Sequence, residues 1–356
     1  MARRAHTRPG HSPISAVCFA GLGDLAAREL TPLIETEVKR TRIRNYDHLS
    51  FGVRAENLPR LRELRIVEDV LIDLGRLSKI ERSADLARLG AIVSKDAVLA
   101  AVQAKNRFDD RRSGSRKTTT FACFVKQDKD RNLRRSEVSS KVEMLVAQQF
   151  PRWRCHDPAQ LEIWVFWSGP ATFAVRLTDE AFKYRGMKPP QREAALRPTL
   201  AAAMVAVANP REDEIVLDPM CGTGTLLLEG LAFNARAKFI GSDVSHDAIA
   251  LAESRLGDQA TLRIADALES LHDDPVDCIL CNLPWGHQYS VSESLYRDLI
   301  GNFKRTLQPS GRMVLLTDQA QMLESAFTDS GVEWSREARV LVRGKWANIY
   351  KAHLRD

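Results

Sequence analysis

The feature that most constrains the fold is a regular alternation of short apolar segments with segments of helical periodicity, which begins at Pro198. Strands that are joined through helices lie parallel, and helices cover both faces of their sheet. Two further alternating segments meet at Arg343-Gly344 and predict a terminal hairpin. We therefore expect residues 198–356 to form an α/β domain with a doubly wound, seven-stranded sheet that has an antiparallel hairpin at its edge. The apolar segments before the hairpin are 214–219, 238–243, 261–266, 277–284 and 312–318.

The first predicted strand runs into the loop DPMCGTG, residues 218–224. Glycines such as Gly222 and Gly224 suit a turn in which the backbone closely approaches a ligand, and Thr223 lies between them. No lysine follows, as a phosphate-binding loop would need, and the third glycine of a dinucleotide fingerprint is missing. Because Asp218 would repel a pyrophosphate, we expect a ligand with positive charge, and S-adenosylmethionine carries a sulfonium and an ammonium group. The alternative is a purely structural turn.

The next two predicted strands also end in acidic residues. Asp243 follows the glycines by about 20 residues, where an acceptor for a ribose diol is expected, although an aspartate here could instead cap a helix. Asp266 and Ala267 end the third strand and are candidates for contact with an adenine amino group. Ligands of open α/β sheets bind beyond the carboxyl ends of the strands, so these residues should share one edge.

The fourth predicted strand ends in the segment CILCNLPWG. It resembles an element of enzymes that methylate exocyclic amines of nucleobases, which implies such an amine as the methyl acceptor. An exocyclic amine of a purine is a poor nucleophile because its lone pair is delocalised into the ring. Acceptors for its two N–H protons would hold the lone pair towards a methyl donor. Asn282 can supply one acceptor, and a backbone carbonyl of Leu283 or Pro284 can supply the other. Trp285 offers a face on which an extruded base can stack, while the role of His287 is left open.

The two halves of the chain differ in charge. Residues 1–200 contain 37 Lys and Arg against 24 Asp and Glu, whereas residues 201–356 contain 15 against 22. A basic half of this kind indicates docking on a polyanion such as RNA, with a solvated basic surface as the alternative. The candidate RNA-binding residues lie in two basic loops and in a proline-containing linker, and they are Arg111, Arg112, Arg116, Lys117, Arg131, Arg134, Arg135, Lys183 and Arg185.

The composition disfavours several other classes of protein. No apolar run approaches the ~20 residues that span a bilayer, so we expect no membrane insertion. Among six cysteines only Cys278 and Cys281 have C-x-x-C spacing, and no second pair completes a zinc site. On a strand these two side chains point to opposite faces, so we expect no metal and a reduced, cytoplasmic protein.

The motifs at the predicted strand ends resemble those of a known family. Residues 218–224, Asp243, Asp266 and the tetrapeptide Asn282-Leu283-Pro284-Trp285 are similar to the motif set of class I S-adenosylmethionine-dependent methyltransferases. The tetrapeptide resembles the Asn/Asp-Pro-Pro-aromatic element of enzymes that methylate exocyclic amines of nucleobases, from which Leu283 departs. That resemblance also implies that Asn282 lies beside the methyl donor.

The front of the chain carries a second resemblance. The segments CFAGLGDLAARELTPL and YRGMKPPQREAALRPTLAAAMV, together with the basic front half, resemble THUMP-domain RNA guanine-N2 methyltransferases. This resemblance implies an α+β ferredoxin-like domain over residues 1–77, a THUMP RNA-binding domain over 78–180, a linker over 181–197 and a Rossmann-like methyltransferase domain over 198–356.

We accordingly expect transfer of a methyl group from S-adenosylmethionine to the exocyclic N2 of a guanosine in tRNA. The THUMP resemblance implies a grip on the acceptor end of tRNA, and hence a target in the acceptor stem. The alternatives are a 23S ribosomal RNA guanine-N2 methyltransferase, a DNA adenine-N6 methyltransferase, a small-molecule methyltransferase, and a non-catalytic RNA-binding protein that retains a donor pocket. The sequence does not require a protein partner.

Overall fold

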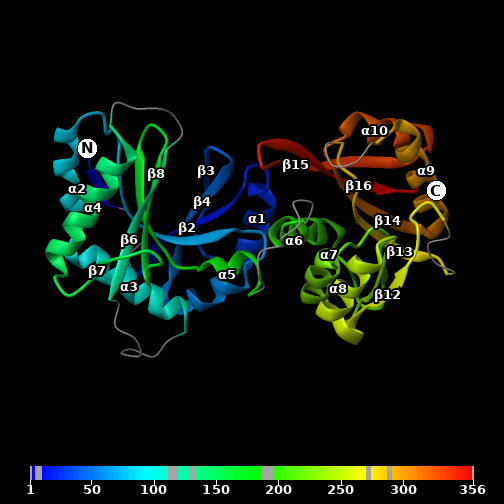
Figure 1. The fold of residues 1–356 in the computed structure, drawn as a ribbon, viewed down its shortest axis with the longest axis horizontal. Helices are drawn as coiled ribbons and strands as arrows, with labels where there is room; N and C mark the ends of the chain where they lie inside the picture. The colour runs from blue at the N-terminus through cyan, green and yellow to red at the C-terminus, as the bar shows by residue number, and fades with distance from the viewer. Residues whose placement is uncertain are drawn as a thin grey trace. The chain divides into compact units, whose positions relative to one another are not determined.

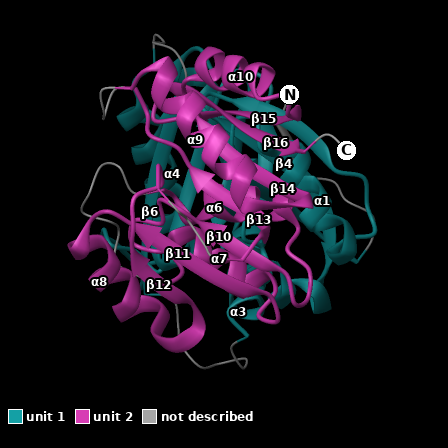
Figure 2. Cartoon of the chain, turned by 90° about the vertical axis from the view of Figure 1, so that its right-hand side faces the viewer, with its two compact units in different colours: residues 1–183 teal, residues 184–356 magenta. Residues whose placement is uncertain are grey.

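The protein forms two compact units in a computed structural model, residues 1–183 and 184–356 (Figures 1 and 2). The structure describes residues 2–4, 10–110, 119–127, 133–186, 196–269, 274–286 and 291–354. Each unit is considered by itself below.

The second unit is built on a seven-stranded sheet in the order β12-β11-β10-β13-β14-β16-β15. All neighbouring strands are parallel except β16, which runs antiparallel to both β14 and β15. The chain order therefore reverses between β10 and β13, which are neighbours in the sheet, and this is where open α/β sheets bind ligands. The strands are β10 (Ile215–Asp218), β11 (Lys238–Asp243), β12 (Thr261–Ile264), β13 (Val276–Asn282), β14 (Leu307–Thr317), β15 (Glu333–Val342) and β16 (Lys345–His353).

Helices cover both faces of this sheet, as the βα alternation predicts (Figure 1). The fully buried Tyr296, Phe303 and Phe327 of α9 and α10 belong to the main apolar core on one face. The other face carries α6, which packs against α7 and reaches β13 and β14. The helices are α6 (Pro198–Ala208), α7 (Thr225–Phe233), α8 (His246–Leu256), α9 (Glu293–Thr306) and α10 (Ala320–Asp329). The predicted fold class is thus confirmed for this unit.

Local sequence signals account for where these helices begin. Ser245 and Ser292 precede α8 and α9, and each hydroxyl accepts a hydrogen bond from a backbone N–H of the first turn, as favoured N-cap residues do. Pro198 occupies the first position of α6, where its missing N–H costs nothing. These starts fix the strand-to-helix connections at one edge of the sheet.

The first unit contains one nine-stranded sheet, in the order β3-β4-β2-β5-β9-β8-β6-β7 with β1 also paired to β5. Because β5 pairs with β9, strands from the proposed 1–77 and 78–180 domains are hydrogen-bonded neighbours. The division between these two domains stays a proposal. The strands are β1 (Ala2–Arg4), β2 (His11–Phe19), β3 (Lys39–Ile43), β4 (Tyr46–Arg54), β5 (Asp69–Leu77), β6 (Thr120–Gln127), β7 (Arg154–Cys155), β8 (Leu161–Trp167) and β9 (Ala171–Arg176). The α-helices are α1 (Gly23–Leu30), α2 (Leu89–Ile92), α3 (Lys95–Phe108), α4 (Arg135–Gln149) and α5 (Glu180–Lys183).

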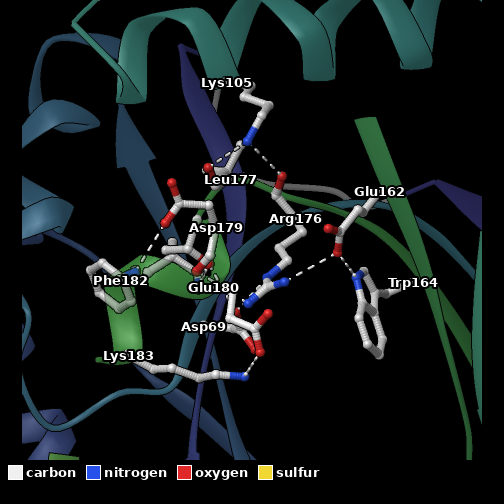
Figure 3. A network of polar contacts seen from close by, with 12 residues as sticks. Asp69, Lys105, Glu162, Trp164, Arg176, Leu177, Asp179, Glu180, Phe182 and Lys183 are labelled. Carbon is white, nitrogen blue, oxygen red and sulfur yellow. Dashed lines mark hydrogen bonds and ion pairs between the residues drawn. The ribbon is translucent and has the colours of Figure 1, made fainter. Parts of the chain in front are cut away.

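A buried guanidinium ties three central strands of this sheet together (Figure 3). Arg176 of β9 is 8% exposed at its side chain and pairs with Asp69 of β5 at 2.6 Å. It also pairs with Glu162 of β8 at 3.2 Å and donates to the carbonyl of Asp179. Lys105 of α3 donates to the carbonyl of Leu177 just beyond, at 2.8 Å. The charged groups are therefore compensated inside the fold, as buried charges must be.

Removing this guanidinium should be costly, because Asp69 and Glu162 would lose the buried cation that both of them contact. We expect Arg176→Met to lower the free energy of unfolding by about 2–3 kcal/mol in urea denaturation. Arg54→Met is the matched control, since the side chains of Arg54 and its partner Glu35 are 50% and 56% exposed, and it should cost under about 1 kcal/mol. Equal losses for the two variants would contradict the assignment.

Candidate active site

The carboxyl ends of four parallel strands meet at one edge of the second unit, and the polar residues predicted from the sequence lie there. In the ladder, Asp218 of β10 pairs with Gly241 of β11, and Asn282 of β13 pairs with Leu316 of β14. Asp218, Asp243 and Asn282 thus end three strands that are consecutive in the sheet. The register places them around the point where the strand order reverses.

The glycine loop after β10 is folded back onto the end of β11. The N–H of Gly222 donates to Asp243 Oδ2 at 2.9 Å, and the N–H of Cys221 donates to the carbonyl of Ser242 at 2.9 Å. Gly222 and Gly224 adopt φ values of +53° and +77°, which side chains rarely tolerate. A Cβ on Gly224 would lie 2.7 Å from Leu256 Cδ1, whereas one on Gly222 would meet open space. Gly222 is therefore the point at which a ligand can approach the backbone.

Thr223, between the glycines, is held by a residue that the sequence did not indicate. Arg255 of α8 donates from Nη1 to the Thr223 hydroxyl at 2.9 Å and also to the Thr223 carbonyl. Burial lowers the pKa of Arg255. The guanidinium thus fixes the loop from the side of the helix that follows β11.

Asp218 lies beneath the loop and not on its surface. Its side chain is 1% exposed, and its Oδ1 accepts from the N–H of Met220 at 3.2 Å. Burial and, to a smaller extent, the negative charge of Asp243 raise the pKa of this carboxyl to about 8. Asp218 therefore supports the loop from below and does not present an open acceptor to a ligand.

Asp243 holds both the glycine loop and the start of α8. Its Oδ1 accepts from the N–H of Ser245, which begins α8, at 2.9 Å, while its Oδ2 accepts from Gly222. A carboxylate offers about four acceptor sites, so each oxygen retains capacity for a ribose hydroxyl. The residue links the second strand to the glycine loop whether or not a ligand is bound.

The turn after β12 contains Asp266 and Ala267, and it is shaped by α9. Asp266 is exposed and its Oδ1 accepts from the N–H of Leu268. Asn302, a buried residue of α9, donates from Nδ2 to the carbonyl of Ala267 at 2.7 Å. The sequence does contain a signal for this contact, because an asparagine on the apolar side of an amphipathic helix requires a partner.

Asn282 and Trp285 contact each other at the end of β13. The indole N–H of Trp285 donates to Asn282 Oδ1 at 3.0 Å, which orients the carboxamide and leaves this oxygen one further lone pair. Trp285 is only 8% exposed, so most of the stacking face expected from the sequence is covered. In this structure the indole ring therefore orients the carboxamide of Asn282 through its hydrogen bond.

The backbone after Asn282 is anchored from two sides. Leu283 is fully buried, and its N–H donates to the carbonyl of Leu316 at 3.0 Å. The hydroxyl of Tyr296 donates to the carbonyl of Pro284 at 2.9 Å and contacts the hydroxyl of Thr317 at 2.5 Å. Because the leucine side chain fills the apolar core, its departure from the usual proline leaves the backbone position fixed.

The loop is closed by the segment that follows β14. The N–H of Gly286 donates to Asp318 Oδ1 at 3.2 Å. A Cβ on Gly286 would lie 2.5 Å from Nε2 of Gln319, so these two segments of the chain are in close contact. Tyr296, Thr317 and Asp318 were not among the residues predicted from the sequence. The polar pair Thr317-Asp318 nevertheless ends a fifth apolar strand, and this is a signal by which it could have been found.

The basic residues expected to bind RNA fall into three groups. Arg134 and Arg135 are exposed at the start of α4. Lys183 pairs with Glu180 at 3.5 Å, and Arg185 pairs with Glu229 of α7, which is 2% exposed, at 3.0 Å. The remaining positions lie outside the described residues, as does His287, and they are Arg111, Arg112, Arg116, Lys117 and Arg131.

A parallel sheet of this strand order, with a glycine loop beneath one strand end and an amide at the next, defines the class I methyltransferase fold. Residues 185–348 match the family model described as UPF0020, the RMKL-like methyltransferase domain. This part of the chain is therefore similar to a methyltransferase domain.

The protein is similar to curated proteins and to solved structures. It is 28% identical over 224 residues to the U6 snRNA (guanine-N(2))-methyltransferase THUMPD2 of Bos taurus, covering 59% of this chain and 42% of that protein. It is 28% identical to the tRNA (guanine(6)-N(2))-methyltransferase THUMP3 of Mus musculus, covering 51% of this chain and 39% of that protein. The chain thus spans about two fifths of the length of these relatives. The crystal structure of TrmN from Thermus thermophilus has the same fold, with a TM-score of 0.79 at 22% identity over 97% of this chain and all of that one.

The residues at the edge of the sheet fit S-adenosylmethionine. Gly222 offers open backbone and Asp243 offers acceptor capacity, while the buried Asp218 supports the loop that carries Gly222. Among the described residues there is no cluster of three or more side chains suited to a metal ion. In that same part of the chain, no helix combines the length and apolarity needed to cross a bilayer.

The buried carboxyl of Asp218 should make stability depend on pH. The pKa of Asp218 is about 8 in the folded state and near ~3.9 in the unfolded state, so the folded protein binds more protons between these values. The contribution of this carboxyl to the free energy of unfolding is therefore full below about pH 4 and is lost as the pH rises to about 8. We expect the free energy of unfolding of Asp218→Asn, measured in urea on the full chain, to rise relative to that of the wild type by about 1 kcal/mol per pH unit between about pH 5 and 7. Parallel profiles for the two proteins would show that the carboxyl is not perturbed.

Proposed function

We propose that the protein transfers a methyl group from S-adenosylmethionine to the exocyclic N2 of a guanosine in tRNA, within the acceptor stem. The observation that carries the proposal is the oriented carboxamide of Asn282 beside the anchored carbonyl of Pro284. Relatives named for guanine-N2 methylation of tRNA and of U6 snRNA support the choice of the acceptor atom.

The chemistry requires the nitrogen lone pair to be held in line with the methyl group. Asn282 Oδ1 accepts one N–H of the guanine amine through its free lone pair, and the carbonyl of Leu283 or Pro284 accepts the other. The donor supplies a methyl group on a sulfonium, and the C–S bond breaks as the N–C bond forms. The nitrogen then releases one proton to solvent. Most of the rate would come from this positioning, so the residues that fix the loop matter as much as the acceptors.

RNA binding by the first unit is supported by a cluster of cations from separate elements. Lys126 of β6 lies 5.1 Å from the ring centroid of Trp164. Burial and then the charges of Arg44, Lys183 and Arg135 lower the pKa of Lys126. Positive groups that converge in this way favour a phosphate backbone. We propose that this surface binds tRNA and, on the basis of the THUMP resemblance, that it contacts the acceptor end.

Ribosomal RNA remains the main alternative substrate, and a relative named for U6 snRNA shows that the class of RNA varies among similar proteins. A non-catalytic RNA-binding protein is the alternative from another class. The orientation of Asn282 by Trp285 and of the Pro284 carbonyl by Tyr296 argues against this alternative, because RNA binding alone does not require that arrangement. We place the protein in the cytoplasm as part of the same proposal.

The proposal is tested by the Asn282→Ala variant, which removes one acceptor and leaves the glycine loop intact. With labelled donor and bulk unmodified tRNA, we expect transfer to fall at least about 100-fold, the scale seen when one transition-state hydrogen bond is lost. Donor affinity, measured by calorimetry, should change less than about threefold. Loss of donor affinity in parallel with transfer would refute the role of Asn282. Mass spectrometry of the product nucleoside should show N2-methylguanosine, and N6-methyladenosine would refute the choice of acceptor.

Tyr296 acts through Pro284 as a positioning residue. Tyr296→Phe deletes the hydroxyl that holds the Pro284 carbonyl, so we expect kcat to fall about tenfold while the KM for tRNA and the donor affinity stay within about twofold. Thr317→Val is the matched control, because it removes the neighbouring hydroxyl and leaves the bond from Tyr296 to Pro284 in place. A kcat loss that is equal in the two variants would indicate a merely structural role.

A further inference from the structure

The hairpin formed by β15 and β16 extends past the edge of the sheet at which the candidate site lies. Thr317, the last residue of β14, pairs with Asn348 of β16. Beyond that level the hairpin continues alone through three more residue pairs, from Val340–Ala347 to Val342–Lys345. It projects from the body of the second unit in Figure 1, where it is coloured orange to red.

The direction of the projection follows from strand polarity. β15 and β14 both run antiparallel to β16, so β15 runs parallel to β14 and ends at the same edge as Asn282. At a strand rise of about 3.3 Å, three residue pairs carry the hairpin roughly 10 Å beyond Thr317. Trp346 then lies roughly 14 Å from Asn282, counting about 10 Å along the strands and about 10 Å across two strand spacings.

The projecting part of the hairpin is basic and aromatic. Residues 338–348 contain Arg339, Arg343 and Lys345 and no acidic residue, within a half of the chain that has an excess of acidic residues. The guanidinium of Arg339 lies 4.7 Å from the ring centroid of Trp346. Trp346 nevertheless remains 39% exposed. An indole ring that is exposed to water at a projecting tip does not contribute to the apolar core.

We propose that this hairpin contacts the RNA on either side of the target nucleotide, with Trp346 stacking on a base and the basic residues contacting phosphates. This inference rests on the proposed function and names a surface of the catalytic unit itself. A distance of roughly 14 Å corresponds to about four base steps at ~3.4 Å, so the hairpin meets nucleotides that flank the target. Stacking between a base and an aromatic ring tolerates any sequence.

Charge complementarity favours RNA over a protein partner. The tip offers an aromatic ring already stacked by a cation, together with two further cations at the turn, and RNA-binding surfaces combine these same features. An apolar protein interface would instead exclude charged residues from its centre. The hairpin also keeps its backbone paired up to the turn at Arg343-Gly344, where φ values of +49° and +82° close a tight connection.

The same hairpin supplies a matched control. Trp334 on β15 is also 39% exposed, but it lies at the far end of the strand from the candidate site, since it pairs with Ala352, which is level with Met313. It packs against Phe327 and Tyr350. Trp334→Ala should therefore lower the melting temperature and leave RNA binding unchanged. Trp346→Ala should weaken RNA binding and leave the melting temperature unchanged.

The experiment measures KM and kcat on a pool of unmodified tRNA transcripts, with donor affinity and melting temperature alongside. We expect Trp346→Ala to raise KM about tenfold with donor affinity unchanged, Trp346→Phe to stay within about threefold of wild type, and Trp334→Ala to stay within about twofold. Replacing Arg343 and Lys345 by Gln should flatten the salt dependence of RNA binding by about two units of slope.

Two outcomes would overturn the inference. One is an unchanged KM for Trp346→Ala while the wild type transfers methyl groups to the pool. The other is an equal rise in KM for Trp346→Ala and Trp334→Ala. If the wild type transfers nothing, the proposed function fails, and filter binding of the same transcripts then decides for the hairpin alone. Binding weakened only by Trp346→Ala supports the contact, and unchanged binding refutes it.

Discussion

The site depends on one constraint: a strand buried on both faces can carry polar groups only where it ends. In β13 every residue from Cys278 to Cys281 is fully buried, and Asn282 is the first that is not. Parallel pairing then brings the ends of β10, β11, β13 and β14 to one edge, because the connecting helices return each strand to the same starting side. The polar groups of the candidate site converge for this reason, although they come from distant parts of the chain.

Much of the second unit could be predicted from the sequence, because its pattern is redundant. The segment 238–243 coincides with β11, and the other predicted strands and helices overlap the observed ones. The central strands β10, β13 and β14 are largely apolar, and α9 has a clear apolar face, so length and periodicity agree there. The main polar residues of the site were also found, since they stand directly after these strands. The residues that hold them, such as Tyr296 and Arg255, were missed because their partners are distant in the sequence and their spacing is that of any helix.

The first unit shows where such reading fails. Near its start β4 contains the polar residues Asp47 and His48, which are uncommon in a buried strand. In the structure both are buried, and Asp47 accepts hydrogen bonds from the N–H of Gly21 at 2.9 Å and from Arg42 at 2.9 Å. A buried carboxylate of this kind is satisfied only by tertiary contacts, which a local pattern does not contain. Residues 58–66 likewise have helical leucine spacing but form only the 3-10 helix Pro59–Glu63, as the proline and the short length favour.

The distribution of charge bears on the proposed contact with RNA. Residues 201–356 include 22 acidic residues against 15 basic ones, and the proposed donor site contains Asp218 and Asp243. An acidic surface repels an RNA backbone, so this half can engage RNA only where cations are concentrated and aromatic rings are exposed. Within the described part of the second unit, the projecting hairpin meets both conditions beside the site. The basic first unit can supply most of the affinity, while the hairpin needs only to guide the strand whose base enters, and a few contacts suffice for that.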